Sequence, residues 1–198
     1  TNITKTENPN YLFVTIDTKN VKAQELQFTF ANGKKSFKRN FEIKKRKPNS
    51  ALRKSFDASD VMYLLMPDRF ANGNPDNDNM PGMIEKADRS NPLGRHGGDV
   101  SGIRKHLDYL KDLGVTALWI NPLLENNNKA LTYHGYAITD FYKIDARYGT
   151  NDDYVALVDE AHQKNMKIIM DMVFNHCGIN HWFINDLPMK NWIHQFPE

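Results

Sequence analysis

The chain has 198 residues, of which 40% are hydrophobic and 25% are charged, and its formal net charge at pH 7 is +2. This composition is typical of an ordinary globular protein with enough apolar residues to form a core. The single cysteine, Cys177, excludes an internal disulfide, and no apolar run approaches the length of a membrane-spanning helix. Residues 1–9 lack the basic and then apolar profile of a signal peptide, so we expect that any export signal has already been removed.

The charges are distributed unevenly along the chain. Residues 1–57 hold 13 Lys and Arg against 5 Asp and Glu, whereas residues 58–198 hold 13 against 19. The basic run at residues 44–47 is compatible with nucleic-acid binding. No stacking aromatic residues interrupt this run, however, and lysines at the edge of a sheet also discourage edge-to-edge pairing. We therefore expect a solvated strand edge and no nucleic-acid partner.

The first part of the chain is expected to form β-strands. Residues 11–16 are a short run bounded by turn-forming residues, residues 25–30 alternate in polarity, and residues 36–43 resume a strand-like pattern. Residues 31–34 supply a hairpin turn signal between the second and third of these runs. These strands predict an N-terminal domain over residues 1–57 that is part of an all-β, immunoglobulin-like sandwich followed by a linker.

From residue 60 onward, short apolar runs alternate with amphipathic segments. Residues 61–66 form an apolar run that ends at a proline, as expected of a strand buried on both faces. Ser101 is the predicted cap of a helix that continues through Leu113 and stops at Gly114. Another apolar run at residues 115–120 predicts a second buried strand.

A second helix is predicted to begin near Asn151 and to be followed by a strand over residues 167–173. The resulting order is βαβαβ, which implies parallel strands joined by right-handed crossovers. This order fits either a doubly wound α/β sheet or the first units of a (β/α)8 (TIM) barrel. No G-x-G-x-x-G or Walker loop follows a strand, so nucleotide binding lacks its main sequence support.

Polar and aromatic residues follow each predicted strand of this second part. In a barrel, the loops that begin near residues 67, 121 and 174 would open on the same face, where active sites are built. Residues 133–136 place two tyrosines beside a glycine, which could offer a flat face to a sugar ring. Asp171 lies within an apolar run and therefore needs an arginine or a hydrogen-bonding partner. His176 could donate to a ligand hydroxyl, although a lone histidine is more often a structural residue.

The segment 72–79 is rich in Asn and Asp, and residues 97–99 add Gly-Gly-Asp later in the chain. Calcium takes six to eight oxygen ligands from carboxylates, amides and carbonyls, and a loop of this composition supplies several of them. The alternative is a metal-free turn, because Asn, Asp, Gly and Pro dominate turns for reasons unrelated to metals.

Taken together, these motifs resemble the α-amylase family of glycoside hydrolases (family 13), and most closely its neopullulanase and cyclomaltodextrinase branch. Residues 171–176, DMVFNH, are similar to the D-x-V-x-N-H signature at the end of the third barrel strand of that family. Residues 133–136, 139–145 and 148–150 are similar to the loop before it. The resemblance runs from about residue 60 to the end of the chain.

The resemblance implies a fold, a cofactor and site residues. It implies that residues 58–176 form the first three β/α units of a catalytic barrel, that residues 177–198 begin the insertion after strand three, and that the substrate is an α-glucan. Tyr136 would stack on the sugar, His176 would hydrogen-bond the same ring, and Asp171 would be a supporting carboxylate. The expected calcium ligands are Asn72, Asn74, Asn77, Asp78, Gly97 and Asp99.

The residues that perform catalysis in this family follow barrel strands four, five and seven, so we expect the chain to be a truncated part that lacks the nucleophile and the acid/base. The parent protein is expected to be a retaining hydrolase of α-1,4 linkages in starch-derived oligosaccharides, periplasmic or secreted, with a homodimer possible. A non-catalytic glycan-binding or interaction protein with an amylase-like barrel is the alternative.

Overall fold

The computed structural model describes residues 1–52 and 54–194. The chain divides into two units: Thr1–Ser55 together with the segment that begins at Leu187, and Phe56–Asp186. Within the described residues, no helix is both long enough and apolar enough to cross a membrane.

The N-terminal unit is built from antiparallel strand pairs. Strand β1 (Asn2–Lys5) pairs with β2 (Leu12–Thr15), and β3 (Gln24–Asn32) pairs with β4 (Lys35–Ile43). Gly33, at a φ of 58°, begins the turn of the β3–β4 hairpin, as the turn signal predicted. The three predicted strands are confirmed, and β1 is an addition that the sequence analysis missed. An immunoglobulin-like sandwich stays a prediction.

The remaining elements of this unit are two short 3-10 helices, η1 (Ser50–Leu52) and η5 (Lys190–Trp192). The segment that begins at Leu187 contacts the strands directly, because the Asn8 side chain donates to the Leu187 carbonyl at 2.9 Å. The Trp192 ring also stacks on Phe13, with centroids 6.1 Å apart. Within the described residues, Leu187 and Trp192 therefore contact the N-terminal part of the chain. The assignment of residues 177–198 to a barrel insertion stays a prediction.

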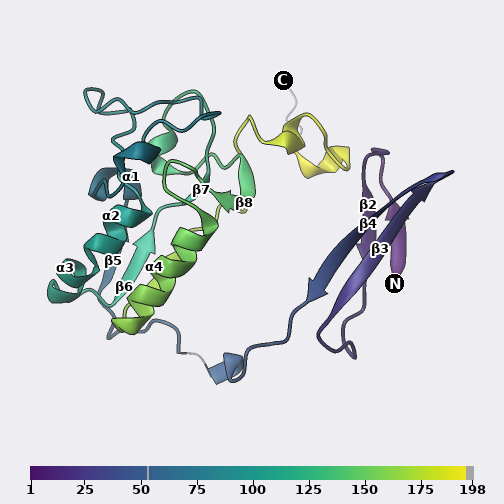
Figure 1. Cartoon of the computed structure of the whole chain (residues 1–198), viewed down its shortest axis with the longest axis horizontal. Coiled ribbons are helices and arrows are strands. Elements are labelled where there is room, and N and C mark those ends of the chain that lie inside the picture. Colours follow the sequence, from purple (N-terminus) through teal and green to yellow (C-terminus); the bar gives the residue numbers. More distant parts are fainter. Residues whose placement is uncertain (53, 195–198) are drawn as a thin grey trace. The chain divides into compact units, whose positions relative to one another are not determined.

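The second unit contains a parallel sheet in the order β5-β6-β9, of which Figure 1 labels β5 and β6. Its strands are β5 (Met62–Leu65), β6 (Ala117–Ile120) and β9 (Lys167–Met170). The helices between them are α2 (Val100–Lys105), α3 (Leu107–Asp112) and α4 (Asn151–Gln163). Helix α2 packs against α4, and α4 packs against β9. The predicted βαβαβ order with parallel strands is confirmed.

The other elements of this unit lie in the loops that follow the strands. They are α1 (Pro67–Phe70), η2 (Pro75–Asn77), β7 (Leu124–Glu125), η3 (Thr132–His134), β8 (Asp140–Ile144) and η4 (Trp182–Ile184). Strands β7 and β8 pair in antiparallel fashion, which the sequence analysis did not predict.

The predicted helix over residues 101–113 is wrong in two respects. It is divided at His106 into α2 and α3, and its cap is Asp99 instead of Ser101. The Asp99 side chain accepts a hydrogen bond from the backbone N–H of Gly102 at 2.6 Å, so the helix starts at Val100. Gly114 has a φ of 90° and follows the end of α3, as predicted.

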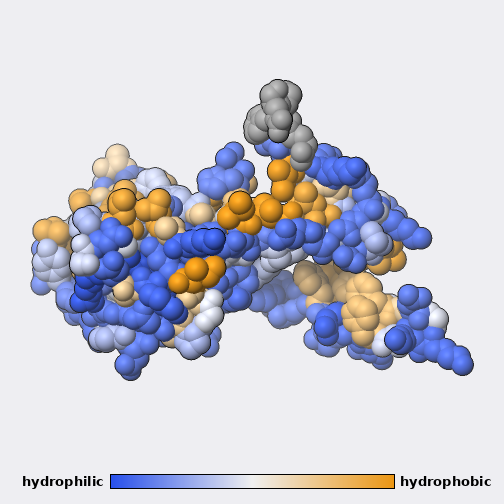
Figure 2. All heavy atoms as spheres, turned by 90° about the horizontal axis from the view of Figure 1, so that it is seen from above, coloured by the Kyte–Doolittle hydropathy of each residue, from blue (hydrophilic) through white to orange (hydrophobic). Residues whose placement is uncertain are grey.

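The expectation that the first strand is buried on both faces is also wrong. Leu65 is 1% exposed and joins the core beneath the helices, whereas Leu64 on the opposite face is 61% exposed. Trp119, its register partner on β6, is 40% exposed. The helices cover one face of this sheet, and no described residue covers the side chains of Leu64 and Trp119 fully. Figure 2 shows hydrophobic side chains reaching a mainly hydrophilic surface in several places.

Candidate functional site

A hydrogen-bonded cluster lies where the loops after β6 and β9 meet. The Tyr136 hydroxyl donates to Oδ2 of Asp171 at 2.8 Å, and the indole N–H of Trp119 donates to the same oxygen at 3.1 Å. Nε2 of His176 lies 2.8 Å from the Tyr136 carbonyl oxygen, which accepts its proton. The structure therefore brings together Tyr136, Asp171 and His176, as expected, and adds Trp119. We call these four residues the Tyr136 cluster.

Asp171 lies immediately after β9. The predicted strand over residues 167–173 had placed it inside the strand, which is wrong. The requirement for a hydrogen-bonding partner is confirmed, since the phenol and the indole both donate to its carboxylate. Asp171 is half-buried, and its side chain joins residues from β6, from the loop that follows β6 and from the end of β9. This arrangement makes Asp171 the central acceptor of the cluster.

The Tyr136 ring is 37% exposed, so one part of it remains accessible to a ligand. The His134 ring stacks beside it with centroids 5.9 Å apart, and Nδ1 of His134 accepts the Tyr136 backbone N–H at 3.0 Å. Partial burial, followed by the hydrogen bond to Asp171, raises the pKa of Tyr136 to about 12. The phenol is therefore neutral over the physiological range and acts as a donor to the carboxylate.

Gly135 allows the chain to turn directly before Tyr136. Its φ is 86°, and a Cβ added there would lie 2.2 Å from the Pro122 carbonyl oxygen. A side chain at this position would therefore meet both backbone strain and a steric clash. The close approach to Pro122 places the tyrosine beside the end of β6.

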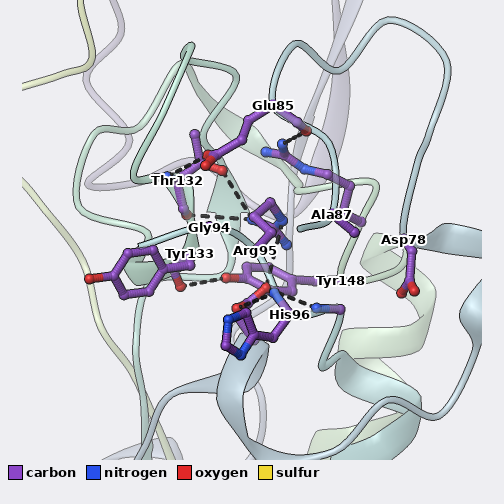
Figure 3. Close-up of polar contacts among 12 residues, drawn as sticks. Asp78, Glu85, Ala87, Gly94, Arg95, His96, Thr132, Tyr133 and Tyr148 are labelled. Atoms are coloured by element: carbon purple, nitrogen blue, oxygen red, sulfur yellow. Dashed lines mark hydrogen bonds and ion pairs between the residues drawn. The ribbon is translucent and has the colours of Figure 1, made fainter. Parts of the chain in front are cut away.

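Several polar side chains form hydrogen bonds to the loop that contains Tyr136 (Figure 3). Arg95, which is 1% exposed, donates through Nη1 to the Thr132 carbonyl at 3.4 Å and to the Thr132 hydroxyl at 3.3 Å. A carboxylate oxygen of Glu85 accepts the Thr132 backbone N–H at 2.8 Å, and the Tyr148 hydroxyl donates to the Tyr133 carbonyl at 2.9 Å. The start of the loop is therefore fixed by at least three buried or half-buried side chains.

Buried charges beneath this loop are paired. Arg147 donates to both oxygens of Asp145, at 2.9 Å and 2.7 Å, and Arg95 lies 3.7 Å from a carboxylate oxygen of Asp68. Burial by itself would raise the pKa of Asp145, but the hydrogen bonds and positive charge of Arg147 hold it below its usual range. Removing one partner of such a pair leaves an uncompensated buried charge, so these pairs fix the loop geometry.

The Asn- and Asp-rich loop folds back on residues 97–99, as the calcium hypothesis requires. Asn72 donates through Nδ2 to Oδ1 of Asp78 at 2.7 Å. Gly97 has a φ of 84°, and a Cβ there would lie 2.4 Å from the same Asp78 oxygen and 2.9 Å from Asn72 Nδ2. The two segments are thus in direct contact, and only glycine fits at position 97.

Two amide oxygens in this loop are consistent with a hard cation. The Oδ1 atoms of Asn72 and Asn77 are buried and have no hydrogen-bond partner. An unpaired buried polar atom is unfavourable unless a partner such as a metal ion satisfies it. The described residues contain no group of three or more His, Cys, Asp and Glu side chains able to hold a metal, so a site here needs amide and carbonyl oxygens in addition to the carboxylates of Asp78 and Asp99. This donor set is typical of calcium and unlike that of zinc.

Asn74 and Asp99 contribute differently from the other expected ligands. The Asn74 side chain is exposed, and its oxygen accepts the Asp76 backbone N–H at 3.3 Å. Asp99 is fully buried, and its oxygens accept hydrogen bonds from two backbone groups of the loop, from the Asn77 amide and from the helix start. Asp99 therefore holds the loop to α2 whether or not a metal is bound.

Sequence reasoning did not identify Trp119, Arg95 or Glu85 as parts of the site. Trp119 stands in an apolar run that only predicted a strand, and Arg95 and Glu85 stand in a loop without a recognised motif. An arginine next to the Gly-Gly-Asp segment was the one available signal, but its burial depends on the fold.

Comparisons with known proteins show which family the chain resembles over most of its length. Residues 64–195 match the family model described as alpha amylase, catalytic domain, and residues 1–47 match the model described as cyclomaltodextrinase, N-terminal. Neopullulanase 2 of Thermoactinomyces vulgaris is 40% identical over 134 residues, which cover 66% of this chain and 22% of that protein. The periplasmic alpha-amylase of Escherichia coli is 39% identical over 130 residues, which cover 60% of this chain and 19% of that protein.

Among solved structures, an alpha-amylase from Anoxybacillus matches with a TM-score of 0.62 and 45% identity. The match covers 70% of this chain and 29% of that chain. The chain therefore spans between 19% and 29% of the length of these relatives.

Proposed function

The chain belongs to the α-amylase family of glycoside hydrolases, and we propose that it forms part of a retaining hydrolase that cleaves α-1,4-glucosidic bonds of starch-derived oligosaccharides. The observation that carries this proposal is the convergence of Tyr136, Asp171 and His176 at the ends of neighbouring parallel strands. The carboxyl ends of barrel strands are where enzymes with this fold build their active sites. Relatives named neopullulanase and periplasmic alpha-amylase support the same substrate class.

Each residue of the cluster has a distinct role in this proposal. The exposed part of the Tyr136 ring stacks on the apolar C–H face of a glucose unit, and Asp171 fixes the phenol through its hydroxyl. His176 is exposed and donates to the Tyr136 carbonyl, so a hydrogen bond from Nε2 to a sugar hydroxyl would replace that contact. The cluster binds and orients the sugar; bond cleavage requires other groups.

We propose that parts of the enzyme outside this chain supply the reacting carboxyl groups. A retaining glycosidase uses two carboxyl groups about 5 Å apart on either side of the scissile bond. Asp171 is the one carboxylate of the Tyr136 cluster, and its hydrogen bonds to Trp119 and Tyr136 suit a positioning role. The isolated chain should therefore show no measurable hydrolysis of maltooligosaccharides. Turnover by purified chain, free of contaminating amylase, would refute this assignment.

We also propose that Asn72, Asn74, Asn77, Asp78, Gly97 and Asp99 hold one calcium ion. The unpartnered oxygens of Asn72 and Asn77 and the contact of Gly97 with Asp78 support this proposal. Bound calcium would supply a positive charge that joins the loop to the start of α2. Its role would be structural, since these residues lie outside the Tyr136 cluster.

Calcium binding to the folded state alone should raise the melting temperature as calcium concentration rises. We expect Asn77→Ala to abolish this dependence, because the variant lacks an amide oxygen that would face the ion. Asp76→Ala is the matched control, since Asp76 lies in the same loop and is exposed. A melting temperature that changes with neither calcium nor chelator would refute the calcium proposal and support a metal-free turn.

The proposed sugar site is tested by kinetics of the complete enzyme. Tyr136→Ala should lower kcat/KM for maltooligosaccharides about ten-fold or more, because an aromatic contact worth about 1.4 kcal/mol is lost. Stability should change little, since the ring is partly exposed. Tyr109→Ala is the control, because Tyr109 is an exposed tyrosine on α3. Unchanged kinetics in Tyr136→Ala would contradict the proposal.

We further propose that the enzyme works outside the cytoplasm, as the name periplasmic alpha-amylase says of its Escherichia coli relative. Fractionation of cells that express the complete protein tests this proposal, and activity confined to the cytoplasm would overturn it. A homodimer of the complete protein stays a prediction, for which sedimentation is the measurement.

A further inference from the structure

Trp119 contributes to the Tyr136 cluster from the sheet itself. It lies on β6 opposite Ile169 of β9, and Asp171 follows Ile169 by two residues. Side chains alternate across a strand, so Ile169 and a residue two positions later project to the same side. The indole N–H of Trp119 reaches Oδ2 of Asp171 at 3.1 Å from this position.

Two of the three donors of the cluster meet at one oxygen atom. Oδ2 of Asp171 accepts from the Trp119 indole and from the Tyr136 hydroxyl, the latter at 2.8 Å. An indole N–H can only donate, so this contact has one possible direction and holds the carboxylate in one orientation. The position of Oδ2 in turn sets the tilt of the Tyr136 ring, because the phenol donates to it.

The hydroxyl of Tyr136 is held by a directional hydrogen bond, whereas the ring itself has a stacking contact. The ring is 37% exposed, and its other described partner, the His134 ring, contacts it by stacking at 5.9 Å. Stacking constrains the separation of two rings more than their rotation. The hydroxyl contact is therefore the directional restraint on the part of the ring that would meet a sugar.

We infer that Trp119 is a positioning residue for glucan binding, acting through Asp171 on Tyr136. This inference rests on the proposed function of the Tyr136 cluster. Trp119 itself need not touch the substrate; its indole N–H fixes the carboxylate that fixes the phenol. The competing explanation is that Trp119 only packs on the sheet face that it shares with its register partner Leu64.

A double-mutant cycle in the complete enzyme separates these explanations. Trp119→Phe keeps an aromatic ring but removes the donor, and Tyr136→Phe removes the hydroxyl. Each should lower kcat/KM for maltooligosaccharides about three- to ten-fold, the effect of losing one hydrogen bond. The double variant should be no worse than either single variant, because both changes break the same chain of contacts.

The control for packing is Leu64→Ala, which truncates a neighbouring side chain on the same face of the sheet. It should change the melting temperature little, because Leu64 is 61% exposed, and any effect on kcat/KM should add to that of Tyr136→Phe. Additive losses for Trp119→Phe and Tyr136→Phe would show that Trp119 acts by packing, and would overturn the inference.

An activity-independent measurement keeps the inference separate from the proposed function. In enzyme labelled with ¹⁵N at its tryptophan indoles, the Trp119 signal is assigned from its loss in Trp119→Phe. Asp171→Asn should shift this signal, because the acceptor loses its charge. A signal that does not move would overturn the inference, whereas a shifted signal in an enzyme without glucan hydrolysis would refute the proposed function alone.

Discussion

The two units of the molecule are stabilised in different ways. In residues 1–55, no described side chain is buried, and the strands are held mainly by backbone pairing with half-buried side chains on alternate positions of β3. In Phe56–Asp186, a continuous core of aliphatic side chains lies between the parallel sheet and its helices. Fully buried Arg95, Asp99, Asp145 and Arg147 are also found in this second unit.

This difference indicates where precise geometry is maintained. Isolated two-stranded pairs are marginally stable in water, so the N-terminal unit has few groups whose position is over-determined. In the second unit, packed apolar residues stabilise the sheet. Buried ion pairs fix the loops that contain the Tyr136 cluster. The candidate site is therefore expected to depend on the second unit and to tolerate changes in the first.

The two units should differ most in how much stability they lose when an apolar side chain is truncated in the complete enzyme. Leu118→Ala should reduce the free energy of unfolding by about 4 kcal/mol, because Leu118 is 0% exposed and its removal leaves a cavity. Phe41→Ala, at a position that is 58% exposed, should cost less than about 1 kcal/mol. Denaturant unfolding measures both, and equal losses would contradict the comparison.

Loss of the Asp99 carboxylate should have the next largest effect. Asp99→Ala leaves two loop amides, one side-chain amide and the start of α2 without their acceptor, which should cost about 3 kcal/mol even without calcium. Asp76→Ala, an exposed position in the same loop, should cost less than about 0.5 kcal/mol. Thermal unfolding in the presence of chelator distinguishes this structural role from metal binding. An Asp99→Ala variant with unchanged stability would refute the structural role.

Two glycines with similar backbone angles should respond differently to alanine. Gly135→Ala should cost about 2 to 3 kcal/mol, because a φ of 86° adds to a clash with the Pro122 carbonyl. Gly82→Ala should cost about 1 kcal/mol, because its φ of 81° is similar but no atom lies within 4 Å of the added Cβ. Thermal unfolding compares the two variants. Equal costs would show that Pro122 moves away readily.

The smallest effect expected is a pH dependence that arises at His134. Burial lowers the pKa of His134, so the folded state favours the neutral ring that accepts the Tyr136 backbone N–H. A histidine with a lowered pKa in the folded state stabilises the protein at any pH above its unfolded-state pKa. This stabilisation is lost as the pH falls from the unfolded-state pKa to the folded-state pKa. His134→Gln should flatten this part of the stability profile. His181 has a lowered pKa of the same origin, so the double variant should flatten it further.

Much of the fold was predictable from the order of apolar runs and turn residues. The runs at residues 61–66, 115–120 and 167–173 predicted all three strands of the parallel sheet, because proline, glycine and asparagine bound them closely. The division of the helix at His106 was not predictable, since the apolar spacing continues across it. Asp99 was missed as a cap because Ser101, two residues later, is an equally suitable residue type.

The candidate site was predictable in its residue types but not in its contacts. Tyr136, Asp171 and His176 lie in recognisable motifs, and the structure joins them by hydrogen bonds. Trp119 and Arg95 gained their positions only through tertiary packing, which leaves no periodic pattern in the sequence. The exposed face of β5 was mispredicted because an apolar run does not reveal whether both of its faces are covered within one chain.

The central claim is that the Tyr136 cluster binds a glucose unit of an α-glucan. A crystal structure of the complete enzyme with a bound maltooligosaccharide tests it most directly. We expect the Tyr136 ring to lie against the C–H face of one glucose unit, with Asp171 still accepting the phenol and His176 within hydrogen-bonding distance of the same unit. An oligosaccharide bound elsewhere in a competent enzyme, with the Tyr136 ring free of sugar contact, would contradict this account.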